Sequence, residues 1–369
     1  MFWRFCRRHS GINQKIGDRM ISIRPKYFSQ FKCDGKSCSS RCCKGWRIVI
    51  DESIYTKYHD IKDEVARQEI LSKIERLDDN KYVVKMKEDL SCPFLDEDYL
   101  CKLQKRYGED YLAAICYSYP RVNYKFGDIL EQSLNLTCPI AAKLILLSNI
   151  SLEFEEVDIE TPRGIFDRTA RIKMPIEKAV AFQANAVSIL QDRNCSFNER
   201  LLRLCILLQD EPFVGKMNLN FDIDSHIKVM IDIFSKMYDA NMSEEKKAQL
   251  TKIYIGYNKI ILQRLLENYA HIFENYLVNE FFMRCYPFAF EGGLWENCRI
   301  FITGYKVMEF ALILTAISKN GFVTTEEFLT MIDAVNEKID HNRNGMKAII
   351  EFAKSTTDLQ EFTKLMLSF

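Results

Sequence analysis

Cysteine is the residue type best suited to chemistry in this sequence. The chain has 369 residues and 13 cysteines, and eight of these lie between positions 33 and 138. The eight are Cys33, Cys38, Cys42, Cys43, Cys92, Cys101, Cys116 and Cys138. The first four fall within the eleven residues 33–43, so their thiolates can converge on one centre without long-range folding. The sequence therefore predicts that this region binds a metal.

The spacing of the cysteines bears on which metal they hold. No CxxC pair of the zinc-ribbon kind occurs, and the CxxxCxxC motif usual in radical S-adenosylmethionine enzymes is also absent. Eight thiols could hold two zinc ions, one [4Fe–4S] cluster with spare thiols, or two clusters. Ligands spread irregularly over about a hundred residues favour a buried iron–sulfur cluster, with [4Fe–4S] first and zinc as the alternative.

Charge is distributed unevenly around these cysteines. Lys+Arg and Asp+Glu both number 51, but residues 1–50 carry a local balance of +10 and the remainder −10. Basic side chains beside the first four cysteines are expected to lower thiol pKa values and to offset thiolate charge. No long uninterrupted basic block occurs, so a nucleic-acid partner is not expected.

Candidate catalytic residues outside the cysteines form two small groups. Tyr117, Tyr119 and Arg121 follow Cys116 and could line the same site. Asn275 and Asn279 are four residues apart on one helix, where a solvated stripe is favoured over contact with a polar cofactor. Trp46 could shield the metal or anchor the core.

The helices and strands that the sequence predicts around these residues indicate a mainly α protein. We expect a small α+β cysteine-rich metal-binding domain at 21–150 and an all-helical domain at 151–369, after an extension at 1–20. The acidic segment 151–162 marks the junction. Cys92-Pro93 and Cys138-Pro139 each place a cysteine at a predicted helix N-terminus, where the helix dipole favours thiolate.

Local signals predict several boundaries. Asp51 can cap a helix after a short strand at 47–50, and Gly127-Asp128 can turn a hairpin. Capping boxes begin helices at Ser196 and Thr324. Further segments are predicted as helix at 63–76, 98–107, 109–119, 176–191, 223–238, 244–267, 269–285, 296–318 and 343–354, and as strand at 81–86.

Other patterns exclude whole classes of protein. Only 14 Gly and 8 Pro occur and no GxGxxG loop is present, which disfavours turn-rich β folds and Rossmann methyltransferases. The first twenty residues lack the apolar core of a signal peptide, and the longest apolar run, 310–317, is too short to span a membrane. We expect a cytoplasmic monomer with no membrane partner, in which cysteines stay reduced.

The cysteine-bearing strings resemble a known family. They are FKCDGKSCSSRCCKGWRIVIDESIYTKY, SCPFLDEDYLCKLQ, CYSYPRVNYKFGD and LTCPIAAKLIL. Together with the later HIFENYLVNEFFMRCYPF, they resemble the flagellin lysine-N-methylase family over most of residues 21–320. A broader family of cysteine-rich metal-chelating proteins has a tighter CxxCxxCC pattern, from which this chain departs.

The resemblance implies an activity and its cofactors. It implies methyl transfer from S-adenosylmethionine to lysine ε-amines of flagellin, with an iron–sulfur cluster required and the eight cysteines as metal-site residues. It assigns no residue to the methyl donor or to the lysine proton. The alternative, from another class, is a non-catalytic metal-stabilised module that binds proteins, such as a flagellin adaptor.

Overall fold

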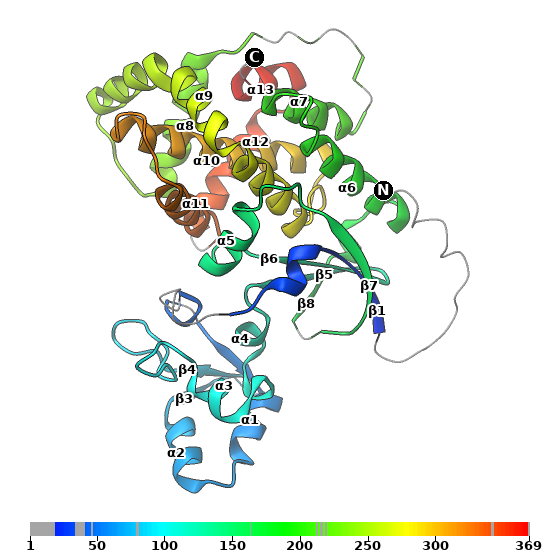
Figure 1. Cartoon of the computed structure of the whole chain (residues 1–369), viewed down its shortest axis with the longest axis vertical. Helices are drawn as coiled ribbons and strands as arrows, with labels where there is room; N and C mark the ends of the chain where they lie inside the picture. The colour runs from blue at the N-terminus through cyan, green and yellow to red at the C-terminus, as the bar shows by residue number, and fades with distance from the viewer. Residues whose placement is uncertain are drawn as a thin grey trace. The chain divides into compact units, whose positions relative to one another are not determined.

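The computed structural model describes residues 19–33, 41–45, 47–78, 81–162, 164–211, 213–214, 217, 220–340 and 343–367. The mainly α class is confirmed, since the structure is 58% helical and has some sheet (Figure 1). The chain forms two compact units. We call 19–142 with 155–167 the cysteine unit, and 143–154 with 168–367 the helical unit.

The cysteine unit contains a five-stranded sheet with the order β7-β1-β6-β5-β8. Its strands are β1 (Arg19–Pro25), β5 (Arg121–Phe126), β6 (Ile129–Leu134), β7 (Phe154–Glu160) and β8 (Ile165–Asp167). β5 and β6 pair antiparallel from Arg121↔Leu134 to Phe126↔Ile129, which confirms the predicted hairpin. Gly127 lies at the turn with φ +57, a region that favours glycine.

A second sheet in this unit has three strands in the order β2-β4-β3. They are β2 (Val49–Asp51), β3 (Ile74–Asp78) and β4 (Lys81–Val84), with α1 (Glu52–His59) and α2 (Glu64–Ser72) between β2 and β3. Asp51 caps α1 as predicted, because its carboxylate accepts from the Ile54 amide at 3.0 Å. The helix predicted to reach residue 76 ends at Ser72, since the following residues pair with β4 as β3.

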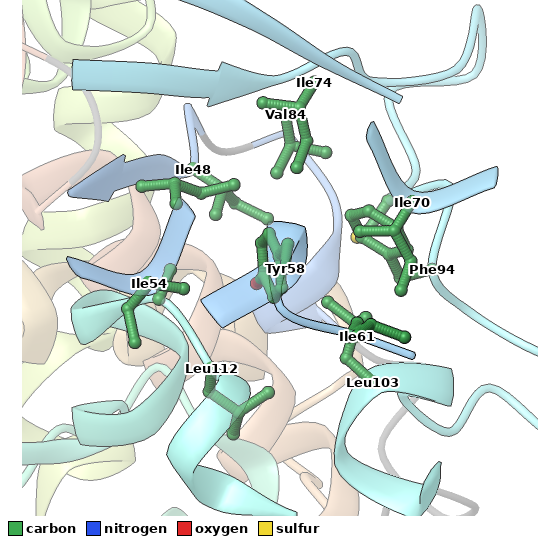
Figure 2. Packing of buried hydrophobic residues seen from close by; sticks show 13 residues of the cluster. Ile48, Ile54, Tyr58, Ile61, Ile70, Ile74, Val84, Phe94, Leu103 and Leu112 are labelled. Carbon is green, nitrogen blue, oxygen red and sulfur yellow. The ribbon is translucent and has the colours of Figure 1, made fainter. Parts of the chain in front are cut away.

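Short helices complete the cysteine unit. They are the 3-10 turns η2 (Lys26–Gln30), η3 (Arg41–Cys43) and η4 (Glu109–Tyr111), and the α-helices α3 (Lys102–Tyr107), α4 (Ala114–Ser118) and α5 (Pro139–Leu146), the last of which continues into the helical unit. Apolar side chains from α1, α2, α3 and the small sheet pack around Tyr58 into one core (Figure 2).

The helical unit is built from eight longer helices. They are α6 (Ile176–Leu190), α7 (Phe197–Leu207), α8 (Ile223–Met237), α9 (Glu244–Met283), α10 (Leu294–Ser318), α11 (Thr325–Asp340), α12 (Arg343–Ser355) and α13 (Leu359–Met366). Both predicted capping boxes are confirmed: Ser196 exchanges bonds with Glu199, and the Glu327 amide donates to the Thr324 hydroxyl at 3.3 Å. The sequence reasoning missed α13.

α9 joins two segments that the sequence separates into two helices, 244–267 and 269–285. The structure has one 40-residue helix that is kinked where Tyr269 takes the non-helical angles φ −130 and ψ 18. The Tyr269 hydroxyl donates to the Val323 carbonyl at 2.6 Å. The predicted break is therefore present as a kink, and the helix resumes after it.

α10 is the central helix of its unit and packs against α7, α8, α9, α11, α12 and α13. It is long and apolar enough to cross a membrane, and 78% of its most apolar window is buried inside the structure. The run predicted from sequence, 310–317, is thus part of a longer apolar helix. Burial on all sides is typical of a core helix.

His226 on α8 makes the helical unit sensitive to acid. Its side chain is 2% exposed, and its Nδ1 lies 2.8 Å from the Leu365 carbonyl. Burial, reinforced by the positive charge of Lys306, lowers the pKa of His226 to about 4. Between pH 6.5 and 4, the unfolded state therefore binds a proton that the folded state does not.

We expect the free energy of unfolding to fall by up to about 3 kcal/mol as the pH drops through this window. His226→Asn keeps an N–H that can reach Leu365 and removes the titration, so its stability should change less between pH 7 and pH 4. Denaturant titrations of both proteins at several pH values measure the difference. His59→Asn, at an exposed position, is the control; equal slopes in the His226 variant and the wild type would contradict the assignment.

Candidate functional site

One cavity of about 370 Å³ in the cysteine unit brings most of the predicted metal-site residues together. Six of the eight cysteines line it: Cys33, Cys42, Cys43, Cys92, Cys101 and Cys116. Cys138 is buried at the start of α5 and is not among the lining residues. Cys38 and Trp46 lie outside the described residues. We call this space the cysteine cavity.

Backbone pairing joins two parts of the chain at the cysteine cavity. Cys42 and Cys43 lie on η3, and the next residue, Lys44, forms an antiparallel bridge with Ser91. The Cys92 amide donates to the Cys43 carbonyl at 2.7 Å. Main-chain hydrogen bonds thereby bring together residues that lie nearly fifty positions apart in the sequence.

Two further cysteines enter from short helices. Cys101 is the N-cap residue of α3 and forms a bridge with Leu95, while Cys116 lies within α4. The prediction that a helix starts after Cys92 is wrong, because the residues that follow form a turn in which the Leu95 amide donates to the Cys92 carbonyl at 3.2 Å. The prediction for Cys138 is confirmed, since α5 begins at Pro139.

The apolar core of the unit also provides walls of the cysteine cavity. Ile48, Tyr58, Phe94, Leu103 and Leu112 belong both to the core and to the lining (Figure 2). Tyr58 is 1% exposed and its hydroxyl donates to the Tyr111 carbonyl at 2.7 Å. The thiols thus lie against side chains that exclude water, and nothing in the cysteine spacing signals which apolar residues these are.

Burial dominates the electrostatics of the thiols. It raises the pKa of Cys92 to about 11, and raises the pKa values of Cys101 and Cys116 as well. The Cys42 thiol is the exception, because a hydrogen bond from Cys43 lowers its pKa; their sulfurs are 3.7 Å apart. The lowering expected for the first four cysteines is found at Cys42, where Cys43 rather than a basic side chain causes it, whereas the same hydrogen bond and desolvation raise the pKa of Cys43.

The donor chemistry fits a thiophilic metal centre. Six sulfur donors around one cavity exceed the four thiolates that zinc or an iron–sulfur cluster takes. Among the described residues, no three or more His, Cys, Asp or Glu side chains are already arranged to hold a metal ion. Metal ligation would also require loss of protons from the buried thiols.

The first group of predicted catalytic residues lines the same cavity. Tyr117, Tyr119 and Arg121 are all in its walls. The Tyr119 hydroxyl lies 3.1 Å from the hydroxyl of Thr137, and the Arg121 guanidinium is 5.2 Å from the ring centre of Phe31. Residues near the cysteines in sequence are thus also near them in space.

Polar residues that the sequence reasoning missed also reach this cavity. Lys32, Gln104 and Glu109 line it. Lys32 adjoins Cys33, so proximity in sequence could have indicated it. Gln104 lies within α3 and Glu109 begins η4, and only the path of the chain brings them to the thiols.

The second group is placed elsewhere, in the helical unit. Asn275 and Asn279 are 0% and 1% exposed on α9, so the interpretation as a solvated stripe is wrong. The Asn275 amide donates to the carbonyls of Ile145 and Ser148 at 3.0 and 2.8 Å. These two bonds satisfy main-chain carbonyls at the C-terminal end of α5, so Asn275 has a structural role.

Comparison with known proteins identifies the class of this chain. A family model described as the FliB lysine N-methylase C-terminal domain matches residues 214–367. The flagellar biosynthetic protein FliU of Salmonella muenchen is 35% identical over 126 residues, which are 33% of this chain and 75% of that protein. The chain belongs to the flagellin lysine-N-methylase family, as the resemblance indicated.

Two relatives carry an enzymatic name. Proteins named lysine-N-methylase from Salmonella typhimurium and Salmonella choleraesuis are each 34% identical over 126 residues. These residues are 33% of this chain and 31% of each relative, so the matched part spans about a third of their length. No solved structure matches the chain.

Tyr58 offers a test of how the core supports the cysteine cavity. Tyr58→Phe removes the hydroxyl that satisfies the partly buried Tyr111 carbonyl, and should lower the free energy of unfolding by about 1 kcal/mol. Tyr58→Ala removes the ring as well and should cost about 3–5 kcal/mol. Denaturant unfolding of the two variants measures both effects. Equal losses in the two variants would contradict a packing role for the ring.

Proposed function

We propose that this chain is a protein-lysine N-methyltransferase that acts on flagellin with S-adenosylmethionine as methyl donor. Membership of the family supports the proposal, together with the names of its relatives, which mention lysine methylation and flagellar biosynthesis. We propose further that it acts in the cytoplasm as a monomer. The single observation that carries the proposal is the cysteine cavity, which combines thiols with Tyr117, Tyr119 and Arg121.

The cofactor that we propose for this cavity is a [4Fe–4S] cluster, with zinc as the alternative. Cys42, Cys43, Cys92, Cys101 and Cys116 are its best ligand candidates, because they enclose one space from three separate segments. Cys33 is exposed at the rim. When bound, such a cluster would supply thiolate-held iron, which either stabilises the fold or offers a coordination position to the amino and carboxylate groups of S-adenosylmethionine.

The residues of the chain would then have to favour the neutral form of the substrate lysine. In the transfer, the lysine nitrogen forms a bond to the methyl carbon as the carbon–sulfur bond breaks, the sulfonium becomes a thioether and the amine loses a proton. A free lysine has a pKa of about 10.4, so the site must favour the neutral amine. Apolar walls do this by desolvation, and the Glu109 carboxylate can accept the proton.

The test of the function is mass spectrometry of purified flagellin. Flagellin is incubated with anaerobically purified, metal-loaded protein and S-adenosylmethionine, and lysine residues should gain methyl groups. Omission of S-adenosylmethionine is the control. If the protein keeps its metal and binds flagellin in a pull-down but adds no methyl group, the adaptor role replaces the enzymatic one.

The metal proposal has its own test. Anaerobically purified protein should be brown with iron and sulfide present, whereas colourless protein with stoichiometric zinc would contradict the cluster. Cys92→Ser and Cys116→Ser, which alter buried lining thiols, should each lose at least about half of the bound metal measured by elemental analysis. Cys195→Ser in the helical unit is the matched control and should retain it. Unchanged metal in both lining variants would rule out this ligand set.

A further inference from the structure

Arg121 is a half-buried cation in the lining of the cysteine cavity. It begins β5, and its guanidinium carbon lies 5.2 Å from the centre of the Phe31 ring, which belongs to a residue that is 5% exposed. Among the described residues, this guanidinium makes no hydrogen bond and no ion pair. A cation that has lost part of its contact with water is stabilised by an anion beside it, so this position favours an anionic ligand.

Arg24 in the same unit shows how the fold treats a similar side chain. Its guanidinium carbon lies 5.4 Å from the centre of the Phe28 ring, and its Nε donates to the Glu155 carboxylate at 2.8 Å. The Arg24 side chain is 17% exposed, so it is half-buried like Arg121. Each arginine thus lies over a phenylalanine ring, but the chain gives Arg24 a carboxylate and, among the described residues, gives none to Arg121.

The other charged residues in the described lining do not neutralise Arg121. Lys32 follows Phe31 in the chain, is exposed, and adds a second positive charge to the lining. Glu109 is the acidic residue of this lining, and its carboxylate accepts from the Gln104 side-chain amide at 3.5 Å. It forms no ion pair with Arg121. We call Arg121 and Lys32 the basic corner of the cysteine cavity.

The shape of a guanidinium suits a carboxylate better than other anions of similar charge. The group is planar, and its N–H donors form a rigid fork that matches the two oxygens of a carboxylate. A contact between the guanidinium of Arg121 and the face of the Phe31 ring leaves the N–H edges able to donate. A lysine ammonium lacks this fork and acts as a point charge.

The cysteine cavity has room for such a group. Its volume of about 370 Å³ lies in the range of small-molecule sites, which is about 300–1,000 Å³. A water molecule takes about 30 Å³ in the liquid, so the three heavy atoms of a carboxylate need on the order of 90 Å³. A carboxylate at the basic corner therefore leaves space for a metal centre in the same cavity.

We propose that the basic corner binds the carboxylate of a small ligand, to which Arg121 donates two parallel N–H bonds. If the proposed function holds, this is the carboxylate at the amino-acid end of S-adenosylmethionine. Arg121 would then orient the methyl donor in the cavity, as a binding residue that takes no part in proton transfer. The donor assignment rests on the proposed function, while the binding of a carboxylate does not.

The first experiment uses anaerobically purified, metal-loaded, full-length protein and sodium acetate as the probe. Thermal unfolding is followed at rising concentrations, against sodium chloride at the same ionic strength and against acetamide, a neutral molecule of the same size. We expect a saturable rise in Tm with acetate alone. Arg121→Gln should abolish the rise. No excess rise with acetate, or an equal rise in Arg121→Gln, would overturn the proposal.

Arg24→Gln is the matched control, because it removes the same group from a phenylalanine ring outside the cavity lining. It should retain the response to acetate.

A further variant separates ligand binding from a competing role, in which Arg121 offsets the negative charge of a thiolate-held metal. Any cation can offset that charge, whereas a bidentate bond needs the fork. Arg121→Lys should therefore keep the bound metal, measured by elemental analysis, and bind acetate at least about tenfold more weakly. Undiminished acetate binding in Arg121→Lys would overturn the bidentate site in favour of the charge-offsetting role.

A second experiment identifies the source of the carboxylate. Equilibrium dialysis without flagellin compares S-adenosylmethionine with its decarboxylated form, and the wild type should bind the latter at least about tenfold more weakly. Arg121→Gln should bind the two about equally. Equal binding of both by the wild type, or binding of neither, would overturn the donor assignment and restrict the site to other carboxylates. Because no methyl transfer is measured, failure here is distinct from failure of the flagellin assay.

Discussion

The hydrogen bond from the Cys92 amide to the Cys43 carbonyl, 2.7 Å long, is the constraint on which the candidate site depends. It joins η3, which carries Cys42 and Cys43, to the segment that follows β4. The bridge Lys44↔Ser91 extends this pairing. Without this pairing, the thiols of η3 would not face Cys92, Cys101 and Cys116. The core around Tyr58 then supplies the apolar walls, so main-chain pairing and side-chain burial act together.

The same burial that forms the cavity works against the ionisation of its thiols. Apolar walls raise the pKa values of the Cys92, Cys101 and Cys116 thiols, whereas a metal needs thiolates. A metal bound there, as we propose, would have to drive proton release and supply the charge that stabilises the thiolates. The walls that disfavour the thiolate also disfavour a charged lysine, which is the condition that methyl transfer requires. One physical cause thus opposes thiolate formation and favours the neutral lysine that the proposed reaction needs.

In the helical unit, buried charged side chains form ion pairs. Lys306 pairs with Glu309 at 2.8 Å, and Arg200 pairs with Glu274 at 3.1 Å, so each of these four buried charges has an opposite partner. Arg284 likewise pairs with Glu280 at 2.6 Å and with Asp340 at 2.5 Å.

Local features were predictable from the sequence because they depend on near neighbours. Asp51 caps α1, Gly127 turns the β5–β6 hairpin, and Ser196 begins α7 through bonds to residues only a few positions away. The cysteine count and the family membership are likewise properties of the sequence itself. The strand β3 was not predictable, because pairing with β4 overrides the helical sequence pattern there. The pKa directions of the thiols were not predictable either, because they follow burial, which the spacing of the cysteines does not reveal. By itself the sequence determined which thiols exist and which local turns and caps form; the tertiary structure decided which of them share a cavity, because that depends on contacts between residues far apart in the chain.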